Sequence, residues 1–168
     1  KVLFNVKVAQ RNFVETVAFE DPMDQIIVPV VIDGTTYHFL FDTGAVTVVS
    51  PAIKDKLSLT PIFTNKLTDG SGSTQEEQIY SLPSLQLGAV TFTTISAAVI
   101  DMSKFNTLMC IKIDGIFGTN IMRTCHWKID YNNQQLVFSD KKIKPSANAK
   151  EVDFKENFSG SPVLKQQM

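Results

Sequence analysis

The sequence predicts an all-β lobe with one or two short helices, and its length, composition and residue pattern all point to this class. Runs rich in Val, Ile, Thr and Phe recur along the chain and are broken about every ten residues by Gly, Pro, Asn or Asp, as short strands joined by turns would be. The 168 residues suffice for one domain with or without a short appendage. With 43% hydrophobic and 20% charged residues, the chain can build a core and is unlike a disordered one.

The clearest local prediction is a hairpin in the first quarter of the chain. An apolar run from Ile26 to Ile32 is followed by Asp33-Gly34 and then by a second run from Thr35 to Phe41. An Asp-Gly pair readily supplies the positive φ angles that a type I′ turn requires. Because side chains alternate along a strand, Phe39 and Phe41 are expected on one face, together with Tyr37.

The remaining elements follow from similar signals. Ser50 and Pro51 have the residue types preferred at the N-cap and first position of a helix, so we expect a short helix through about Leu57. Two further hairpins, a buried strand and a helical turn complete the prediction. The hairpins are residues 79–87 with 90–100 and residues 127–131 with 134–139, the strand is 111–117, ending at Gly118, and the turn is 120–124.

The chemically distinctive segment is Asp42-Thr43-Gly44-Ala45, which lies between two apolar runs predicted to be buried strands. A carboxylate at the exit of a hydrophobic strand is costly to desolvate unless it is hydrogen-bonded, paired or used in chemistry. Thr43 adds a hydroxyl, and Gly44 allows another backbone or a substrate to approach closely. Taken alone, the segment could also be an ordinary β-turn in which Asp42 bonds to its own backbone.

A polar segment, residues 68–78, contains Gly70, Ser71 and Gly72 and is flanked by predicted strands. Its residues favour a mobile hairpin tip, which could be an ordinary loop or a flap that contacts substrate. Its two glycines could also suggest a phosphate-binding loop, but no Lys-Ser/Thr pair and no helix follows them.

Two separated motifs together resemble a known family. Phe41-Asp42-Thr43-Gly44-Ala45 and, about seventy residues later, Ile116-Phe117-Gly118 resemble the two signature elements of retropepsin-like aspartic proteases. The apolar hairpin of residues 127–138 is similar to that of bacterial members. The resemblance covers residues 14–140 and implies a closed acid-protease barrel in which the second motif forms a strand beside the catalytic loop, followed by a short helix.

The resemblance also implies roles for individual residues. Asp42 would be the catalytic carboxylate, Thr43 the hydroxyl that braces paired loops, and Gly44 a backbone contact to substrate, with Ala45 completing the motif. The segment containing Gly70, Ser71 and Gly72 falls where such enzymes carry their flap. The activity implied is hydrolysis of a polypeptide by water activated between two aspartates that share one proton, with no metal and no organic cofactor.

The sequence departs from the viral members at two points, so the resemblance implies nothing about substrate preference. Val46 stands where an acidic residue often follows the motif, and the expected flap has no Ile-Gly-Gly tip. Two other functions stay open beside proteolysis. One is a noncatalytic module of the same fold that binds peptides or assembles with another chain. The other is a generic all-β surface or carbohydrate-binding module in which Asp42 is only a turn residue.

A single Asp-Thr-Gly implies half of a catalytic site. The pairs Asp33-Gly34, Asp69-Gly70 and Asp114-Gly115 lack the hydroxyl residue between them. The second aspartate is therefore expected from an identical chain or from a second protease lobe. We divide the chain into a protease lobe, residues 1–140, and a segment 141–168 that reads as a linker and the possible start of a second lobe. Its Val152 and Phe154 repeat Val17 and Phe19 at a constant offset.

Charge and cysteine usage limit the partners and the setting. Sixteen basic and seventeen acidic residues leave a net charge of −1, so the chain has no surplus charge with which to bind nucleic acid. No apolar run is long enough to span a bilayer. The chain begins at Lys1, and we expect a processed N-terminus and an extracytoplasmic protein, whether periplasmic, secreted or surface-anchored. Cys110 and Cys125 are spaced so that a disulfide is permitted but not required.

Overall fold

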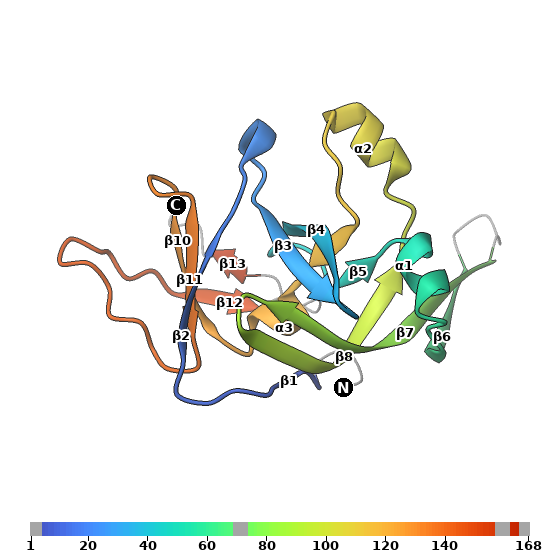
Figure 1. Ribbon diagram of the computed structural model, residues 1–168, viewed down its shortest axis with the longest axis horizontal. Helices are drawn as coiled ribbons and strands as arrows, with labels where there is room; N and C mark the ends of the chain where they lie inside the picture. The colour runs from blue at the N-terminus through green and yellow to red at the C-terminus, as the bar shows by residue number, and fades with distance from the viewer. Residues whose placement is uncertain (1–4, 69–73, 157–161, 165–168) are drawn as a thin grey trace.

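The computed structural model describes residues 5–68, 74–156 and 162–164, and its main body is a closed β-barrel with a small sheet packed beside it (Figure 1). The fold is therefore all-β, as the sequence predicts. The strands are, in chain order, β1 (Lys7–Val8), β2 (Val14–Ala18), β3 (Ile27–Ile32), β4 (Thr35–Phe41), β5 (Val48–Val49), β6 (Pro61–Thr68), β7 (Thr74–Leu87), β8 (Val90–Val99), β9 (Gly115–Phe117), β10 (His126–Asp130), β11 (Gln135–Ser139), β12 (Phe154–Glu156) and β13 (Pro162–Leu164).

The helices are short. They comprise a 3-10 turn η2 (Pro22–Asp24) and the α-helices α1 (Pro51–Lys56), α2 (Ser103–Met109) and α3 (Thr119–Met122). The hydroxyl of Ser50 accepts a hydrogen bond from the backbone N–H of Ile53, which confirms the predicted N-cap of α1. The predicted turn at 120–124 corresponds to α3, whereas α2 was not predicted.

The barrel closes because β8 pairs with β5 on one side and with β7 on the other. The large sheet runs in the order β1-β8-β5-β9-β4-β3-β7-β6, and β8 also pairs with β7. The six strands from β8 to β7 therefore form a ring that leaves β1 and β6 outside it. Within the ring β4 and β9 are parallel, with Leu40 opposite Ile116, so the strand that precedes Asp42 and the second motif lie side by side.

The predicted hairpins form in the expected register. In the turn between β3 and β4, Asp33 has φ 48° and Gly34 has φ 71°, the positive pair that a type I′ turn requires. The β7–β8 and β10–β11 hairpins also form at the predicted positions. The predicted strand over residues 111–117 is wrong in its first half, because only Gly115–Phe117 joins the sheet.

The small sheet, in the order β10-β11-β2, packs against the barrel through aromatic rings. Trp127 of β10 stacks on Phe138 of β11 with ring centroids 4.6 Å apart, and it meets Phe41 edge-on at 5.1 Å. Phe41 in turn stacks on Phe117 at 5.7 Å. Tyr37, Phe39 and Phe41 all contact this main core, as the alternation along β4 predicts. The residue that precedes Asp42 is thus fixed by the centre of the fold.

Both cysteines are free thiols: Cys110 is exposed and Cys125 is half-buried beside Trp127. Burial raises the pKa of the Cys125 thiol. None of the described helices is long and apolar enough to cross a membrane.

Asp140 fastens the chain near its N-terminus to the end of β11. Its carboxylate accepts hydrogen bonds from the backbone N–H of Asn12 at 2.8 Å and of Phe13 at 3.2 Å. The hydrogen bond from Asn12 is the main reason that the pKa of Asp140 lies below its usual range. The contact therefore stabilises the fold above the unfolded-state pKa, and this stabilisation is lost as pH falls through the lower folded-state pKa.

We accordingly expect Asp140→Asn to lower the melting temperature at neutral pH, with a difference from wild type that shrinks in strong acid. Thermal unfolding followed by circular dichroism across this pH range measures the effect. Asp153→Asn, at an exposed position of the C-terminal segment, is the matched control. It should leave the melting temperature unchanged both at neutral pH and in strong acid. A difference between Asp140→Asn and wild type that persists unchanged in strong acid would contradict this account.

Candidate active site

Asp42 lies at the start of the loop that links β4 to β5, and its half-buried carboxylate is held by that loop. Its Oδ1 accepts a hydrogen bond of 2.7 Å from the backbone N–H of Gly44. Thr43 and Gly44 are exposed, whereas Phe41 before the loop and Thr47 after it are buried. The loop therefore presents one oriented carboxylate from a rigid base, the arrangement that acid–base chemistry requires.

The second motif holds both ends of this loop. The backbone N–H of Asp42 donates to the carbonyl of Phe117 at 3.2 Å, and the N–H of Thr119 donates to the carbonyl of Ala45 at 2.8 Å. These two bonds come from the residues on either side of Gly118. The predicted neighbours Ile116, Phe117 and Gly118 therefore do meet the Asp42 loop, from the end of β9 and the start of α3.

Gly118 is required by the closeness of the two segments. A Cβ atom placed on it would overlap the backbone of Val46 and Thr47. We expect Gly118→Ala to cost about 3 kcal/mol of folding stability, or roughly 6–12 °C in melting temperature, because backbone cannot move aside as a side-chain tip can.

Gly34→Ala is the matched control for this prediction. It makes the same chemical change at a positive φ of 71°, but in open space, so its cost should stay near about 1 kcal/mol. Equal losses in the two variants, measured by thermal and denaturant unfolding, would show that the close approach at Gly118 does not matter.

A buried network that sequence reasoning missed holds the far end of the loop. The side-chain oxygen of Asn120 accepts hydrogen bonds from the N–H of Thr47 at 2.8 Å and from its hydroxyl at 2.7 Å. Its amide nitrogen donates to the carbonyl of Ser96 in β8 at 2.9 Å. Asn120 and Thr47 are both fully buried. The signal available in the sequence was a polar Asn two residues after the Ile116-Phe117-Gly118 motif, at the start of the predicted helical turn.

The outer face of β4 carries a second apolar cluster. Leu40 points away from the main core and packs with Ile27, Val48, Met102 and Ile113, and Ile116 lies against this group. The members of this cluster come from β3, β4, β5, β9 and the segment containing α2.

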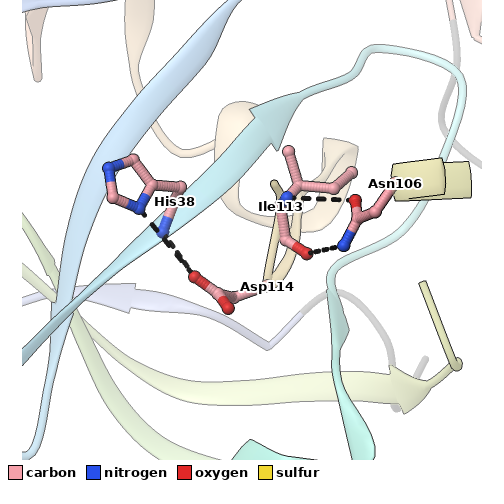
Figure 2. Close-up of polar contacts among 4 residues, drawn as sticks. All are labelled: His38, Asn106, Ile113 and Asp114. Carbon is pink, nitrogen blue, oxygen red and sulfur yellow. Dashed lines mark hydrogen bonds and ion pairs between the residues drawn. The ribbon is translucent and has the colours of Figure 1, made fainter. Parts of the chain in front are cut away.

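Side-chain amide and carboxylate contacts anchor that segment to the sheet (Figure 2). Asn106 of α2 donates from Nδ2 to the carbonyl of Ile113 and accepts from its N–H, both at 3.0 Å, so its amide imitates a neighbouring strand. Asp114 accepts a hydrogen bond of 3.0 Å from the N–H of His38. These contacts set the start of β9 beside β4, and the amide of Asn106 satisfies the backbone N–H and carbonyl of Ile113 without a strand partner.

A groove of about 270 Å³ opens next to Thr43. Its walls combine the aromatic residues Phe41 and Trp127 with α3 and with the C-terminal strands β12 and β13. Of the residues predicted to be catalytic, Asp42, Thr43 and Gly44, it is Thr43 that lines this groove.

Gly70, Ser71 and Gly72, predicted to form a flap, lie outside the described residues. The backbone strands that lead to this segment are present, with β6 paired to β7 as far as Thr68 and Thr74. In the part of the chain that the structure describes, no group of three His, Cys, Asp or Glu side chains is placed to bind a metal ion. Asp42 is the aspartate of the loop that the second motif holds in place.

Comparisons with known proteins agree with this geometry. Among solved structures, the chain is similar to a retropepsin-like aspartic protease from Rickettsia conorii, with a TM-score of 0.51 and 16% sequence identity over 80% of this chain and 92% of that chain. At this identity the similarity concerns the fold. No curated protein sequence matches the chain. The sequence does match the family described as aspartyl protease over residues 28–121, more than half of its length, and this chain therefore belongs to the aspartyl protease family.

Proposed function

We propose that the chain is one lobe of an aspartic endopeptidase and that Asp42 is its catalytic carboxylate. The observation that carries the proposal is the hold on the Asp42 loop. Its carboxylate is oriented by the N–H of Gly44, and both ends of the loop are hydrogen-bonded to residues flanking Gly118. A plain β-turn needs only the hydrogen bond from Gly44 to Asp42. The two further hydrogen bonds to the residues beside Gly118 fix the position of the whole loop, as a catalytic loop would require.

In the proposed mechanism Asp42 acts as one of two aspartates that share a proton. Two carboxylates at hydrogen-bond distance cannot both ionise readily, so one stays protonated while the other is charged. The charged carboxylate takes a proton from a water molecule, which attacks the peptide carbonyl carbon. The protonated carboxylate donates its proton to the carbonyl oxygen. Collapse of the resulting tetrahedral diol then breaks the C–N bond, with a proton passing to the leaving amine.

The second aspartate has two possible sources. One is an identical chain, placed so that two Asp42 loops face each other across a two-fold axis. The other is a second lobe of the same fold, of which residues 141–168 would be the linker and first strands. The pairing of Lys155 with Val163 resembles that of Glu20 with Ile27, at nearly the offset by which Phe154 repeats Phe19. This similarity favours the second route without excluding the first.

A noncatalytic peptide-binding or assembly module of the same fold is the second candidate function. The observation that favours it is the single Asp-Thr-Gly in the chain. Such a module would bind an extended peptide against the lobe without cleaving it.

Hydrolysis of an unfolded protein in acid separates the two candidates. We expect a bell-shaped dependence of the rate on pH, with its maximum on the acid side, because the pair of carboxylates must keep one proton. A statine-type transition-state mimic should block the reaction, and a chelator should not. A rate that is flat from acid to neutral pH and falls on addition of a chelator would count against an aspartic mechanism. Peptide binding without hydrolysis would favour the noncatalytic module.

A further inference from the structure

Trp127 of β10 is the side chain through which the small sheet meets the residues that hold Asp42. Its ring meets Phe41 edge-on at 5.1 Å and Phe117 edge-on at 5.7 Å, and it is stacked on Phe138 at 4.6 Å. Phe41 directly precedes Asp42, and the carbonyl of Phe117 accepts the hydrogen bond from the N–H of Asp42. One side chain therefore packs against the residue before Asp42 and against the acceptor of its backbone hydrogen bond.

The indole N–H fixes the orientation of this ring. Nε1 of Trp127 donates a hydrogen bond of 2.6 Å to the carbonyl of Met122, the last residue of α3. Carbonyls at the end of a helix have no partner within the helix, and this one receives the N–H groups of Trp127 and Cys125. At the other end of α3, the N–H of Thr119 donates to the carbonyl of Ala45. The four residues of α3 thus connect Trp127 to the far end of the loop between β4 and β5.

The chemistry proposed for Asp42 requires that its loop be closely placed. Two carboxylates share a proton only at hydrogen-bond distance, and a displacement of about 1 Å can cost roughly a hundredfold in rate. The hydrogen bond from Gly44 orients the carboxylate within its own loop but does not place the loop in the fold. The hydrogen bonds made by Phe117 and Thr119 do place it, and both residues belong to elements that Trp127 contacts.

We propose that Trp127 is a positioning residue for Asp42, acting through Phe41, Phe117 and the end of α3. The inference rests on the proposed function, because it concerns the carboxylate that is catalytic there. Trp127 also lines the groove beside Thr43, so its ring could instead bind substrate. Loss of a positioning residue lowers kcat, whereas loss of a contact made equally in the ground state and the transition state raises KM.

Two substitutions of Trp127 test the proposal. Trp127→Phe keeps an aromatic ring but removes the indole N–H, and Trp127→Leu removes the ring contacts as well. Hydrogen exchange followed by NMR measures the protection of the backbone N–H groups of Asp42 and Thr119, the two donors that tie the loop to β9 and α3, in the full 168-residue chain. This measurement does not depend on activity, so it tests the positioning even where the proposed function fails.

We expect these two N–H groups to exchange about fivefold faster in Trp127→Phe, the scale of one lost hydrogen bond. In Trp127→Leu the exchange should be at least about twentyfold faster, because the contacts with three rings are also lost. In the active assembly, kcat should fall about tenfold in Trp127→Phe while KM changes less than about twofold.

Phe13→Leu is the matched control. Phe13 meets the ring of Phe138 edge-on at 5.8 Å, and in the described part of the chain it has no ring contact with Trp127. The substitution removes a ring from the same aromatic cluster and should lower the melting temperature about as much as Trp127→Phe does. The exchange of the Asp42 N–H and the value of kcat should nevertheless stay as in wild type.

Three results would overturn the proposal. Exchange at Asp42 and Thr119 that is as slow in the Trp127 variants as in wild type would show that the ring does not hold the loop, and Trp127→Phe decides this alone if Trp127→Leu does not fold. A raised KM with unchanged kcat would make Trp127 a substrate contact. Equally faster exchange in Phe13→Leu would reduce its role to general stability. If exchange responds as expected but the chain, paired with a second aspartate, hydrolyses no peptide, the positioning of the loop stands and the proposed protease function fails.

Discussion

Replacing Asp42 with asparagine is expected to reduce peptide hydrolysis at least about a thousandfold, since general acid–base catalysis by a positioned group contributes on that scale. The amide is close to the carboxylate in shape, and its oxygen can still accept the hydrogen bond from the N–H of Gly44. The variant should therefore fold and melt like wild type. What it loses is the ability to take a proton from water or to share one with a second aspartate.

Asp33→Asn is the matched control for the catalytic variant. Asp33 also precedes a glycine, but it lies in the type I′ turn between β3 and β4, where asparagine is equally well accommodated. Initial rates of peptide cleavage should be the same for this control and for wild type. Hydrolysis that survives in Asp42→Asn would remove Asp42 from the mechanism.

Replacing Asn120 with alanine is expected to lower folding stability by about 3 kcal/mol, the loss typical of a broken buried hydrogen-bond network. The change removes three hydrogen bonds and leaves the buried N–H and hydroxyl of Thr47 without this acceptor. Since Thr47 begins the chain segment after the Asp42 loop, the loop should also become less ordered. Denaturant unfolding measures the first effect, and loss of kcat measures the second.

Thr47→Val separates the parts of this network. It removes the hydroxyl but keeps the backbone N–H that donates to Asn120, so it should cost only about 1 kcal/mol. If Asn120→Ala proved no more destabilising than Thr47→Val, the amide would not be the residue that fixes the end of the loop.

Local signals in the sequence were sufficient for much of the fold. Asp33-Gly34 can make its turn from its own backbone preferences, and Ser50-Pro51 can start α1 without help from distant residues. The alternation in β4 correctly placed Phe39 and Phe41 on one face, which the structure packs into the main core. The pairing of the Asp42 loop with Ile116-Phe117-Gly118 needed more than local signals, and it came from the resemblance of both motifs to one family.

The region before β9 shows why the rest could not be predicted. Ile111 and Ile113 are apolar and read as one strand with Gly115–Phe117, yet Ile113 satisfies its backbone through the side chain of Asn106. This contact depends on α2, which carries Asn106. The N-cap residue of α2, Met102, makes no side-chain hydrogen bond to the helix, so the sequence held no capping signal for this helix. The buried role of Asn120 was missed for a related reason, because its partners Thr47 and Ser96 are distant in sequence.

The most direct test of the account is the dependence of hydrolysis on chain concentration, because the central claim is that Asp42 supplies half of a paired site. Cleavage of a fluorogenic peptide in acid would be measured over a dilution series, with sedimentation at each concentration. We predict that monomeric chains hydrolyse no peptide, whichever source supplies the second aspartate, and that the rate per chain rises with the fraction of dimer where an identical chain supplies it. A constant rate per chain in samples that are monomeric throughout would contradict the account.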